Sequence, residues 1–278
     1  MNWNCNLPTN RNNTCAIDVI VAAWLFSIDS SQFNDPDHII QGLITSIIHL
    51  MRQPFDPMVQ TNVNRMVDTL TAHVAPAFQC RQTDASEFLA MLVAKLGLDA
   101  NVNTQAVQVF GTHIPFPRIP TVEELTRTSD RTEEIGAIFT IHEWVRASSI
   151  HDNLHVRLDS GNLDRKFQKV FTRSITETTF MPRNPFIIHL NRAKYNGAVN
   201  HNPIEINPVI NGFELRSIII HEGVGINSGH FRALLKVAER RWMIYDDIQR
   251  QHPIREADFS RIIHDFKLDT HGILYFYG

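Results

Sequence analysis

The texture of the sequence changes near Gln105, and this change limits the possible folds more than any other feature. Before that point, apolar residues recur at the i, i+3, i+4 and i+7 spacing of amphipathic helices. After it, Gly, Pro and Asn separate short runs rich in Val, Ile, Phe and Thr, which is typical of strands. A helical part followed by a mainly antiparallel sheet is an α+β arrangement, and a cleft between two such parts is a natural site.

The expected elements follow from this periodicity. Helices are expected from Cys15 onward and over residues 36–53, 57–74 and 83–96. Strands are expected over residues 107–114, 137–145, 167–176, 185–191, 213–221, 230–237, 242–245 and 273–277. The sequence also predicts a late helix over residues 255–266 and a long exposed loop over residues 115–131.

Composition excludes several classes of function. The chain has 278 residues, 43% of them hydrophobic, which is enough to bury a substantial core. Its formal charge of −3 and its lack of a basic block argue against nucleic-acid and membrane-surface partners. Residues 1–4 lack the features of a secretory leader, and no apolar run has the length of a membrane span, so we expect an intracellular protein.

Cysteine and histidine motifs give no sign of a metal or a cofactor. Three widely spaced cysteines fit reduced thiols better than a disulfide framework, and no CxxC pair exists. The pairs His142-Glu143 and His221-Glu222 lack the second His of an HExxH motif. There is also no Walker A motif and no GxGxxG after a strand. We therefore expect neither a metal site nor nucleotide chemistry.

Cys15 stands where a polar loop becomes a buried helix. The loop, residues 10–14, is rich in Asn and Thr, and the apolar run of residues 16–26 follows it directly. Backbone N–H groups and the helix dipole at such a position favour a thiolate, the nucleophilic form of cysteine. A lone Cys in a helix is nevertheless more often a packing residue, so Cys15 needs further support.

A second constellation supplies partners for a thiol. Residues 221–231 form a Gly-rich loop that closes on His230, and the strand after it returns through a turn to Asp246 and Asp247. Cys15, His230 and Asp246 could act as nucleophile, base and orienting acceptor, with the Asn10 amide and the Cys15 N–H as oxyanion donors. Among 14 histidines, however, one near an Asp is more often structural.

Six segments, in this order along the chain, resemble the ubiquitin-specific protease family of cysteine deubiquitinases. Residues 10–15 are similar to its Asn-x-Gly-(Asn/Ala)-Thr-Cys box, and residues 82–89 to its Gln-x-Asp-Ala-x-Glu-Phe-Leu helix. The other four are similar to its Leu-rich strand, its Gly-His-Tyr box and its two closing strands, at residues 185–192, 221–231, 242–247 and 273–277. Together they span nearly the whole chain.

The resemblance implies a fold and a set of roles. It implies one catalytic domain, residues 1–278, built as a papain-like hand with a helical thumb (1–104) and a β-rich palm with reduced fingers (105–278). Catalytic roles fall on Cys15 as nucleophile, His230 as general base and acid, Asp246 as orienting group, Asn10 as oxyanion donor and Asp247 beside or in place of Asp246. Substrate contacts fall on Gln82, Asp84, Glu87, Gly229 and Phe231.

The implied activity is hydrolysis of the isopeptide bond after the C-terminal Gly of ubiquitin or a related modifier. Gln82 and Asp84 would line the channel for the arginine-bearing modifier tail. Acidic residues at a helix start also simply complement its dipole, which explains Asp84 and Glu87 without a ligand. The implied partners are the modifier and its conjugates, in the cytoplasm or nucleus, of a host cell if the protein comes from a pathogen.

Departures from the family pattern leave two alternatives open. Asn12 stands where the family has Gly, Phe231 replaces a Tyr, and the two CxxC pairs of the zinc-binding fingers are missing. Because those fingers grip the body of ubiquitin, the modifier is not fixed by the sequence. A catalytically silent ubiquitin-binding scaffold and a cysteine endoprotease acting on a peptide or polyprotein are the competing hypotheses.

Overall fold

The computed structural model describes sixteen segments of the chain. They are residues 5–11, 13–27, 37–79, 84–97, 102–110, 132–135, 138–141, 172–180, 186–192, 199–201, 203–210, 212–225, 228–239, 241–249, 254–257 and 266–278. The expected loop over residues 115–131 lies outside this part of the chain, as do Asn12, Cys80 and Gln82.

The helices of the first part lie close to the positions predicted from periodicity. They are α1 (Cys15–Ser27), α2 (His38–Met51), α3 (Pro57–Val74) and α4 (Ala85–Lys95), with a short 3-10 helix, η2 (Pro76–Phe78), after α3. Asp37, Asp56 and Asp84 are the N-caps of α2, α3 and α4, and each side chain accepts backbone N–H groups of the first turn. These caps fix where the helices begin.

A large sheet forms the second layer. The strands of the whole structure are β1 (Val102–Phe110), β2 (Thr132–Ile135), β3 (Ile138–Ile141), β4 (Thr172–Phe180), β5 (Phe186–Leu190), β6 (Val209–Ile210), β7 (Phe213–Gly225), β8 (Ser228–Ala238), β9 (Arg241–Tyr245), β10 (Ile254–Ala257) and β11 (Gly272–Tyr277). Within the described residues, nine of them form one sheet in the order β10-β9-β8-β7-β11-β5-β3-β2, with β6 paired to β7. Only the pair β3 and β5 is parallel there.

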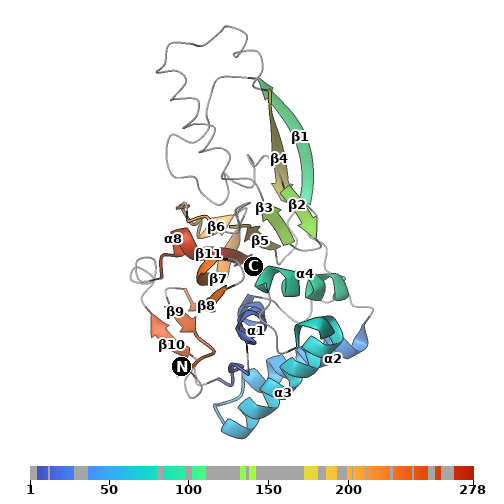
Figure 1. Cartoon of the computed structure of the whole chain (residues 1–278), viewed down its shortest axis with the longest axis vertical. Helices are drawn as coiled ribbons and strands as arrows, with labels where there is room; N and C mark the ends of the chain where they lie inside the picture. The colour runs from blue at the N-terminus through green and yellow to red at the C-terminus, as the bar shows by residue number, and fades with distance from the viewer. Residues whose placement is uncertain are drawn as a thin grey trace.

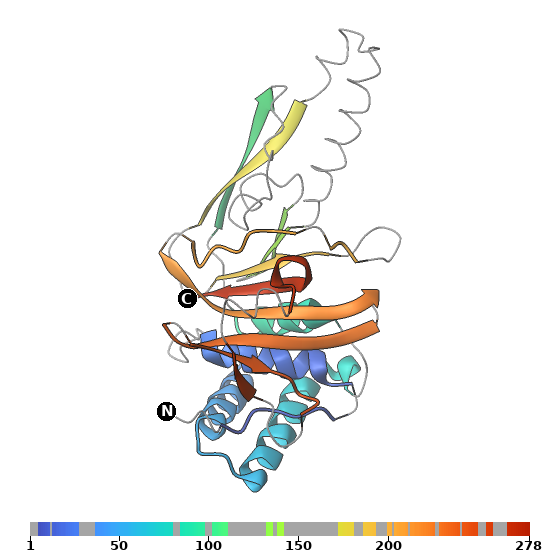
Figure 2. The same ribbon diagram turned by 90° about the vertical axis from the view of Figure 1, so that its left-hand side faces the viewer.

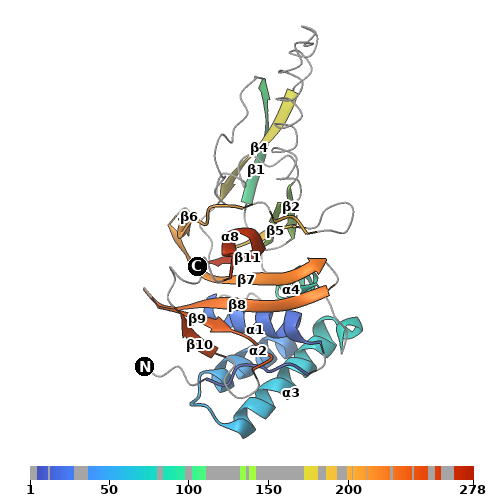
Figure 3. The same cartoon turned by 60° about the vertical axis from the view of Figure 1, so that its left-hand side comes forward.

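The remaining strands, β1 and β4, pair with each other in a separate two-stranded ribbon. Figures 1 and 3 show this ribbon projecting away from the side of the sheet that carries the helices. The structure thus confirms the α+β class predicted from the sequence, with a mainly antiparallel sheet.

Both faces of the central strands are buried. Ile219 of β7 and Ala233 of β8 pack with α1 residues such as Ile20 in a core between the helices and the sheet. Their chain neighbours Ile218 and Leu234 belong to a second core on the opposite face. This alternation follows from the two-residue period of a strand, and Figure 2 shows α1 lying directly against β7 and β8.

The predicted helix over residues 255–266 is wrong where the structure describes it. Residues 254–257 form β10, which pairs antiparallel with β9, and only a short helix, α8 (Leu268–His271), follows later. Pairing with an available sheet edge overrides the local helix preference of Glu256 and Ala257. The sequence also missed β2 and β6. It placed β1 about five residues too late in the chain and β4 about five residues too early.

No helix in the described segments is long and apolar enough to cross a membrane.

Candidate active site

Cys15 is the first residue of α1, as the sequence predicted. Its side chain is buried, with 6% of its surface exposed. Thr14 precedes it, and the carbonyl oxygen of Thr14 accepts the N–H groups of Ile17 and Asp18 at 2.9 Å each. These two bonds begin α1 directly after the loop that carries Asn10 and Arg11.

His230 lies near the start of β8, and the β8–β9 hairpin brings the end of β9 to it. The register pairs Ala233 with Tyr245, so the residues after Tyr245 continue alongside those before Ala233. Nε2 of His230 lies 2.9 Å from Oδ1 of Asp246 and 3.8 Å from Oδ1 of Asp247. The structure thus brings His230 next to Asp246, which the hairpin argument predicted.

The surroundings of His230 favour its charged form. Burial alone would lower its pKa, but hydrogen bonds to Asp246 and Cys15 and the charges of Asp247 and Asp246 outweigh burial and raise the pKa to about 9. The imidazole therefore binds the Asp246 carboxylate and interacts with the Cys15 thiol. This is the arrangement that a proton-transferring base requires.

Asp246 has a second cationic partner that sequence reasoning missed. Nε of Arg232 lies 3.1 Å from Oδ2 of Asp246, and the same guanidinium reaches Glu222 at 3.1 Å. Burial would raise the pKa of Asp246, but the hydrogen bond and charge of His230, followed by the charge of Arg232, hold it below its ordinary value. Asp246 therefore stays ionised. An Arg two residues after the His, on the same face of a strand, is the sequence signal for this contact.

Two hydrogen bonds join Asn10 to Asp247. Its side-chain amide donates to Oδ2 of Asp247 at 2.9 Å, and its backbone N–H donates to the Asp247 carbonyl at 3.0 Å. The hydroxyl of Tyr245 donates to the carbonyl of Pro8 at 2.7 Å. The segment before the nucleophile is thus fixed to the end of β9, and the second amide N–H of Asn10 is the one that can serve an oxyanion.

Among the described residues, one group of side chains could hold a metal ion, and it includes Asp246 and Asp247. His230, Asp246 and Asp247 have ligand atoms within 4.8 Å of one another. His230 and Arg232 bind Asp246, and Asn10 binds Oδ2 of Asp247, whereas Oδ1 of Asp247 has no hydrogen-bond partner among the described residues.

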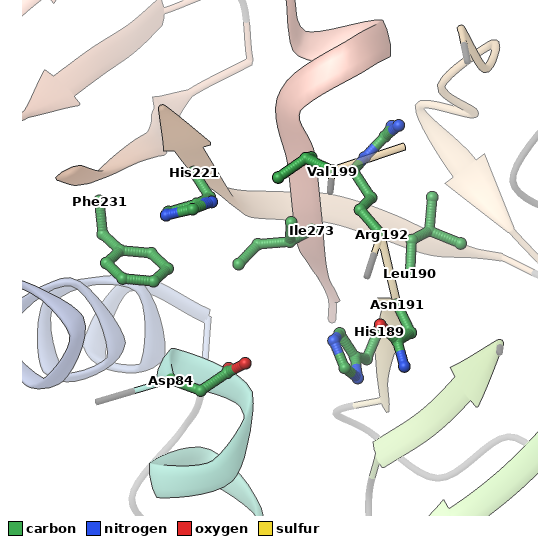
Figure 4. A pocket seen from close by; sticks show the side chains of 9 residues that line it. All are labelled: Asp84, His189, Leu190, Asn191, Arg192, Val199, His221, Phe231 and Ile273. Carbon is green, nitrogen blue, oxygen red and sulfur yellow. The ribbon is translucent and has the colours of Figure 1, made fainter. Parts of the chain in front are cut away.

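A pocket adjoins this array and holds two of the predicted substrate residues. Asp84 comes from the start of α4 and Phe231 from β8, directly after His230. Figure 4 shows Asp84 across the pocket from His221 and Ile273. Its other lining residues are His189, Leu190, Asn191, Arg192 and Val199.

The other predicted substrate residues lie elsewhere. Glu87 is exposed on α4 and does not line the pocket. Gly229 adjoins the pocket residue His221. Its φ is +152°, and an added Cβ would lie 2.5 Å from Nε2 of His221. Gln82 lies outside the described residues. Asp84 and Phe231 therefore line the pocket, their substrate roles stay predictions, and close packing accounts for Gly229.

His221 is a pocket residue to which the sequence analysis gave no role. Its ring stacks on Phe231 with centroids 4.6 Å apart, and Nε2 is buried without a hydrogen-bond partner among the described residues. Burial lowers its pKa, opposed by the charge of Asp84. A neutral imidazole with an unused polar atom therefore faces the pocket.

One family of known proteins matches the sequence over nearly its whole length. The profile of a family described as ubiquitin carboxyl-terminal hydrolase matches residues 8–277. No curated protein matches the sequence significantly.

Solved structures share the fold at low sequence identity. A chain of the SAGA DUB module of Ubp8, Sgf11, Sus1 and Sgf73 bound to monoubiquitin has a TM-score of 0.61 and 13% identity; the match covers 100% of this chain and 70% of that one. The same module bound to ubiquitin aldehyde gives a TM-score of 0.57 at 12% identity, with 100% and 70% covered. A yeast SAGA DUB module gives 0.52 at 13% identity, with 100% and 69% covered.

Proposed function

The chain belongs to the ubiquitin carboxyl-terminal hydrolase family, and we propose that it cleaves the isopeptide bond after the C-terminal Gly of ubiquitin through an acyl-enzyme on Cys15. The observation that carries the proposal is the contact series from Cys15 through His230 to Asp246. The structural neighbours bound to monoubiquitin and to ubiquitin aldehyde support ubiquitin as the partner.

The geometry gives each group a step. His230 takes the thiol proton, and the Cys15 thiolate attacks the carbonyl carbon of the terminal Gly. The resulting oxyanion accepts hydrogen bonds from the Cys15 N–H and the Asn10 amide. The His230 imidazolium then protonates the departing lysine amine, which leaves a thioester.

The second half of the reaction uses the same residues. His230 removes a proton from water, and the hydroxide attacks the thioester carbon. Collapse of this intermediate releases the ubiquitin carboxylate and returns the proton to the Cys15–His230 pair. Asp246 keeps the imidazole oriented through both halves by accepting its Nε2–H.

We assign the pocket beside the array to the modifier tail. An exposed carboxylate, Asp84, lies at its mouth and can pair with an arginine of that tail by a charge-assisted hydrogen bond. The whole chain then acts as one catalytic domain, and the ribbon of β1 and β4 contacts the body of the modifier. The widely spaced reduced cysteines support action in the cytoplasm or nucleus, which fractionation of cells expressing the chain tests.

A ubiquitin with a C-terminal electrophile tests the proposal. We expect one adduct, located on Cys15 by mass spectrometry and absent from C15A. Cys5 is the matched control, because burial raises the pKa of its thiol to about 11 and C5A should react like wild type. Probes built on related modifiers run in parallel identify the modifier.

The other outcomes distinguish the competing functions. Tight binding of ubiquitin without an adduct from folded wild type would indicate a silent binding module. Cleavage of a peptide panel without reaction toward any modifier would indicate an endoprotease. Full activity of C15A would remove Cys15 from the mechanism altogether.

A further inference from the structure

A buried carboxylate that the catalytic steps do not use lies one helical turn after Cys15. The side chain of Asp18 has no exposed surface. Its Oδ1 accepts Nη2 of Arg11 at 2.9 Å, and its Oδ2 accepts the hydroxyl of Thr14 at 2.6 Å. A buried charge is stable only when such partners compensate it, so Asp18 requires Arg11 and Thr14 to stay in these positions.

Arg11 connects this carboxylate to two further elements. Its Nε lies 2.9 Å from Asp68 and its Nη1 lies 3.1 Å from Oδ1 of Asn64, both on α3. Nη1 also donates to the carbonyl of Thr9. The rigid guanidinium fork thus fixes the segment before the nucleophile against α1 and α3 at the same time.

A hydrogen-bonded ring closes around the loop. The backbone N–H of Arg11 donates to the Thr14 hydroxyl at 2.9 Å, and that hydroxyl donates to Asp18. Within this loop, Asn13 adopts a φ of 65°, in the left-handed region that Asn enters more readily than most residues other than Gly. Side-chain hydrogen bonds among Arg11, Thr14 and Asp18 therefore hold the described part of the loop.

The two proposed oxyanion donors flank this ring. Asn10 precedes Arg11 and Cys15 follows Thr14, so the spacing and direction of their N–H groups depend on the loop conformation. We propose that Arg11 and Asp18 are positioning residues that hold residues 10–15 so that both donors face the carbonyl oxygen of the substrate. This inference rests on the proposed thiol hydrolysis at Cys15.

Electrostatics around Asp18 agree with this role. Burial raises its pKa to about 7, against the charge of Arg11 and the hydrogen bond from Thr14, and the charge of Asp247 raises it further. The Arg11 cation therefore favours the ionised form of Asp18 against the effect of burial.

Two conservative variants test the proposal, D18N and R11K. D18N keeps the shape but removes the charge, and R11K keeps the charge but removes the fork that reaches α1 and α3 together. The matched controls are E214Q and R216K, because Glu214 and Arg216 form another carboxylate–guanidinium pair, 3.4 Å apart, on β7. Circular dichroism checks that every variant folds.

The readouts separate positioning from general damage. With ubiquitin carrying a C-terminal coumarin amide, we expect kcat to fall about tenfold or more in D18N and R11K and KM to change less than about twofold. The Ki of ubiquitin aldehyde, whose adduct needs the oxyanion donors, should rise by about the same factor as kcat falls. Alkylation of Cys15 by iodoacetamide needs no oxyanion donor and should stay within about twofold. The two controls should match wild type throughout.

Several results would overturn the positioning role. Wild-type kcat in D18N would do so, as would a loss confined to KM or an equal loss in alkylation. If D18N does not fold, R11K decides alone by the same criteria. Wild type inert toward both ubiquitin reagents would instead refute the proposed function, so the two failures are distinguishable.

Discussion

The side-chain amide nitrogen of Asn10 lies 2.9 Å from Oδ2 of Asp247, although 237 residues separate the two in the chain. Asp247 is fully buried, and burial raises its pKa against the charge of His230 and the hydrogen bond from Asn10. Its neighbour Asp246 binds His230 instead. The two consecutive carboxylates therefore have different partners: Asp246 binds the proposed base, His230, and Asp247 binds the proposed oxyanion donor, Asn10.

This division predicts unequal effects for two identical substitutions. D246N should lower kcat about 100-fold, because it removes the negative charge that is hydrogen-bonded to His230 and stabilises its imidazolium. D247N keeps an oxygen that can accept from Asn10 and removes only a more distant charge, 3.8 Å from His230, so it should lower kcat only about fivefold. Steady-state kinetics on the coumarin substrate measure both. A D247N variant as impaired as D246N would transfer the orienting role to Asp247.

The raised pKa of His230 predicts an alkaline limit of activity. The pKa is about 9 in the folded chain against an ordinary 6.5, so kcat/KM should fall above pH 9 as the imidazolium loses its proton. Asp246 supplies part of this shift, and D246N should move the limit down by about one pH unit. The pH dependence of kcat/KM measures both limits, and an unmoved limit in D246N would contradict the assignment.

The raised pKa of His230 also predicts how the stability of the fold changes with pH. A raised histidine pKa stabilises the fold fully below pH 6.5, and that stabilisation is lost as the pH rises through about 9. Melting temperatures of wild type should therefore decline over this range more steeply than those of H230Q.

Asp84 has a capping role and a proposed ligand role, and two substitutions separate them. D84N keeps a capping side chain for α4 but removes the charge, so KM for ubiquitin substrates should rise about tenfold with kcat and melting temperature unchanged. D84A should also lower stability by about 1 kcal/mol. The matched control is D56N at the N-cap of α3, away from the pocket residues, which should leave KM unchanged. An unchanged KM in D84N would exclude the charge from substrate binding.

Gly229 is a backbone position with little room for a side chain. Its φ of +152° disfavours a side chain, and an added Cβ would lie 2.5 Å from Nε2 of His221 and 2.6 Å from the carbonyl of Glu222. G229A should displace the hairpin that carries His230, lowering stability by roughly 1–3 kcal/mol and kcat more than tenfold. G42A, in α2 with no atom near the new methyl, should instead gain up to about 1 kcal/mol. Thermal melts with kinetics test the pair, and wild-type kcat in G229A would contradict the prediction.

The sequence predicted what depends on local pattern. Helix α3 has the predicted bounds because Asp56 caps it and Pro57 suits the first turn. The meeting of His230 and Asp246 followed from a hairpin, whose two ends must lie together. What failed depends on distant partners: β10 is a strand because β9 offers it an edge, and Arg11 is defined by α3 residues more than fifty positions away.

Asp18 is a residue whose buried ion pair the sequence could have predicted, although the sequence analysis did not do so. It is the single charged residue in the apolar run of α1, and a charge within such a run demands a partner. Asn13, with a φ of 65°, has a left-handed conformation that the sequence argument did not assign to it. Both residues lie within three positions of the nucleophile.

The position of β11 has a consequence for the synthesis of the protein. This strand, residues 272–277, lies between β7 and β5, and both of them precede it in the chain. Until β11 has been synthesised and inserted, β7 and β5 each lack one neighbour, and the hairpin that bears His230 has no continuous sheet to rest on. A nascent chain that ends before β11 can therefore form the helix that carries Cys15 but not the complete sheet that supports His230.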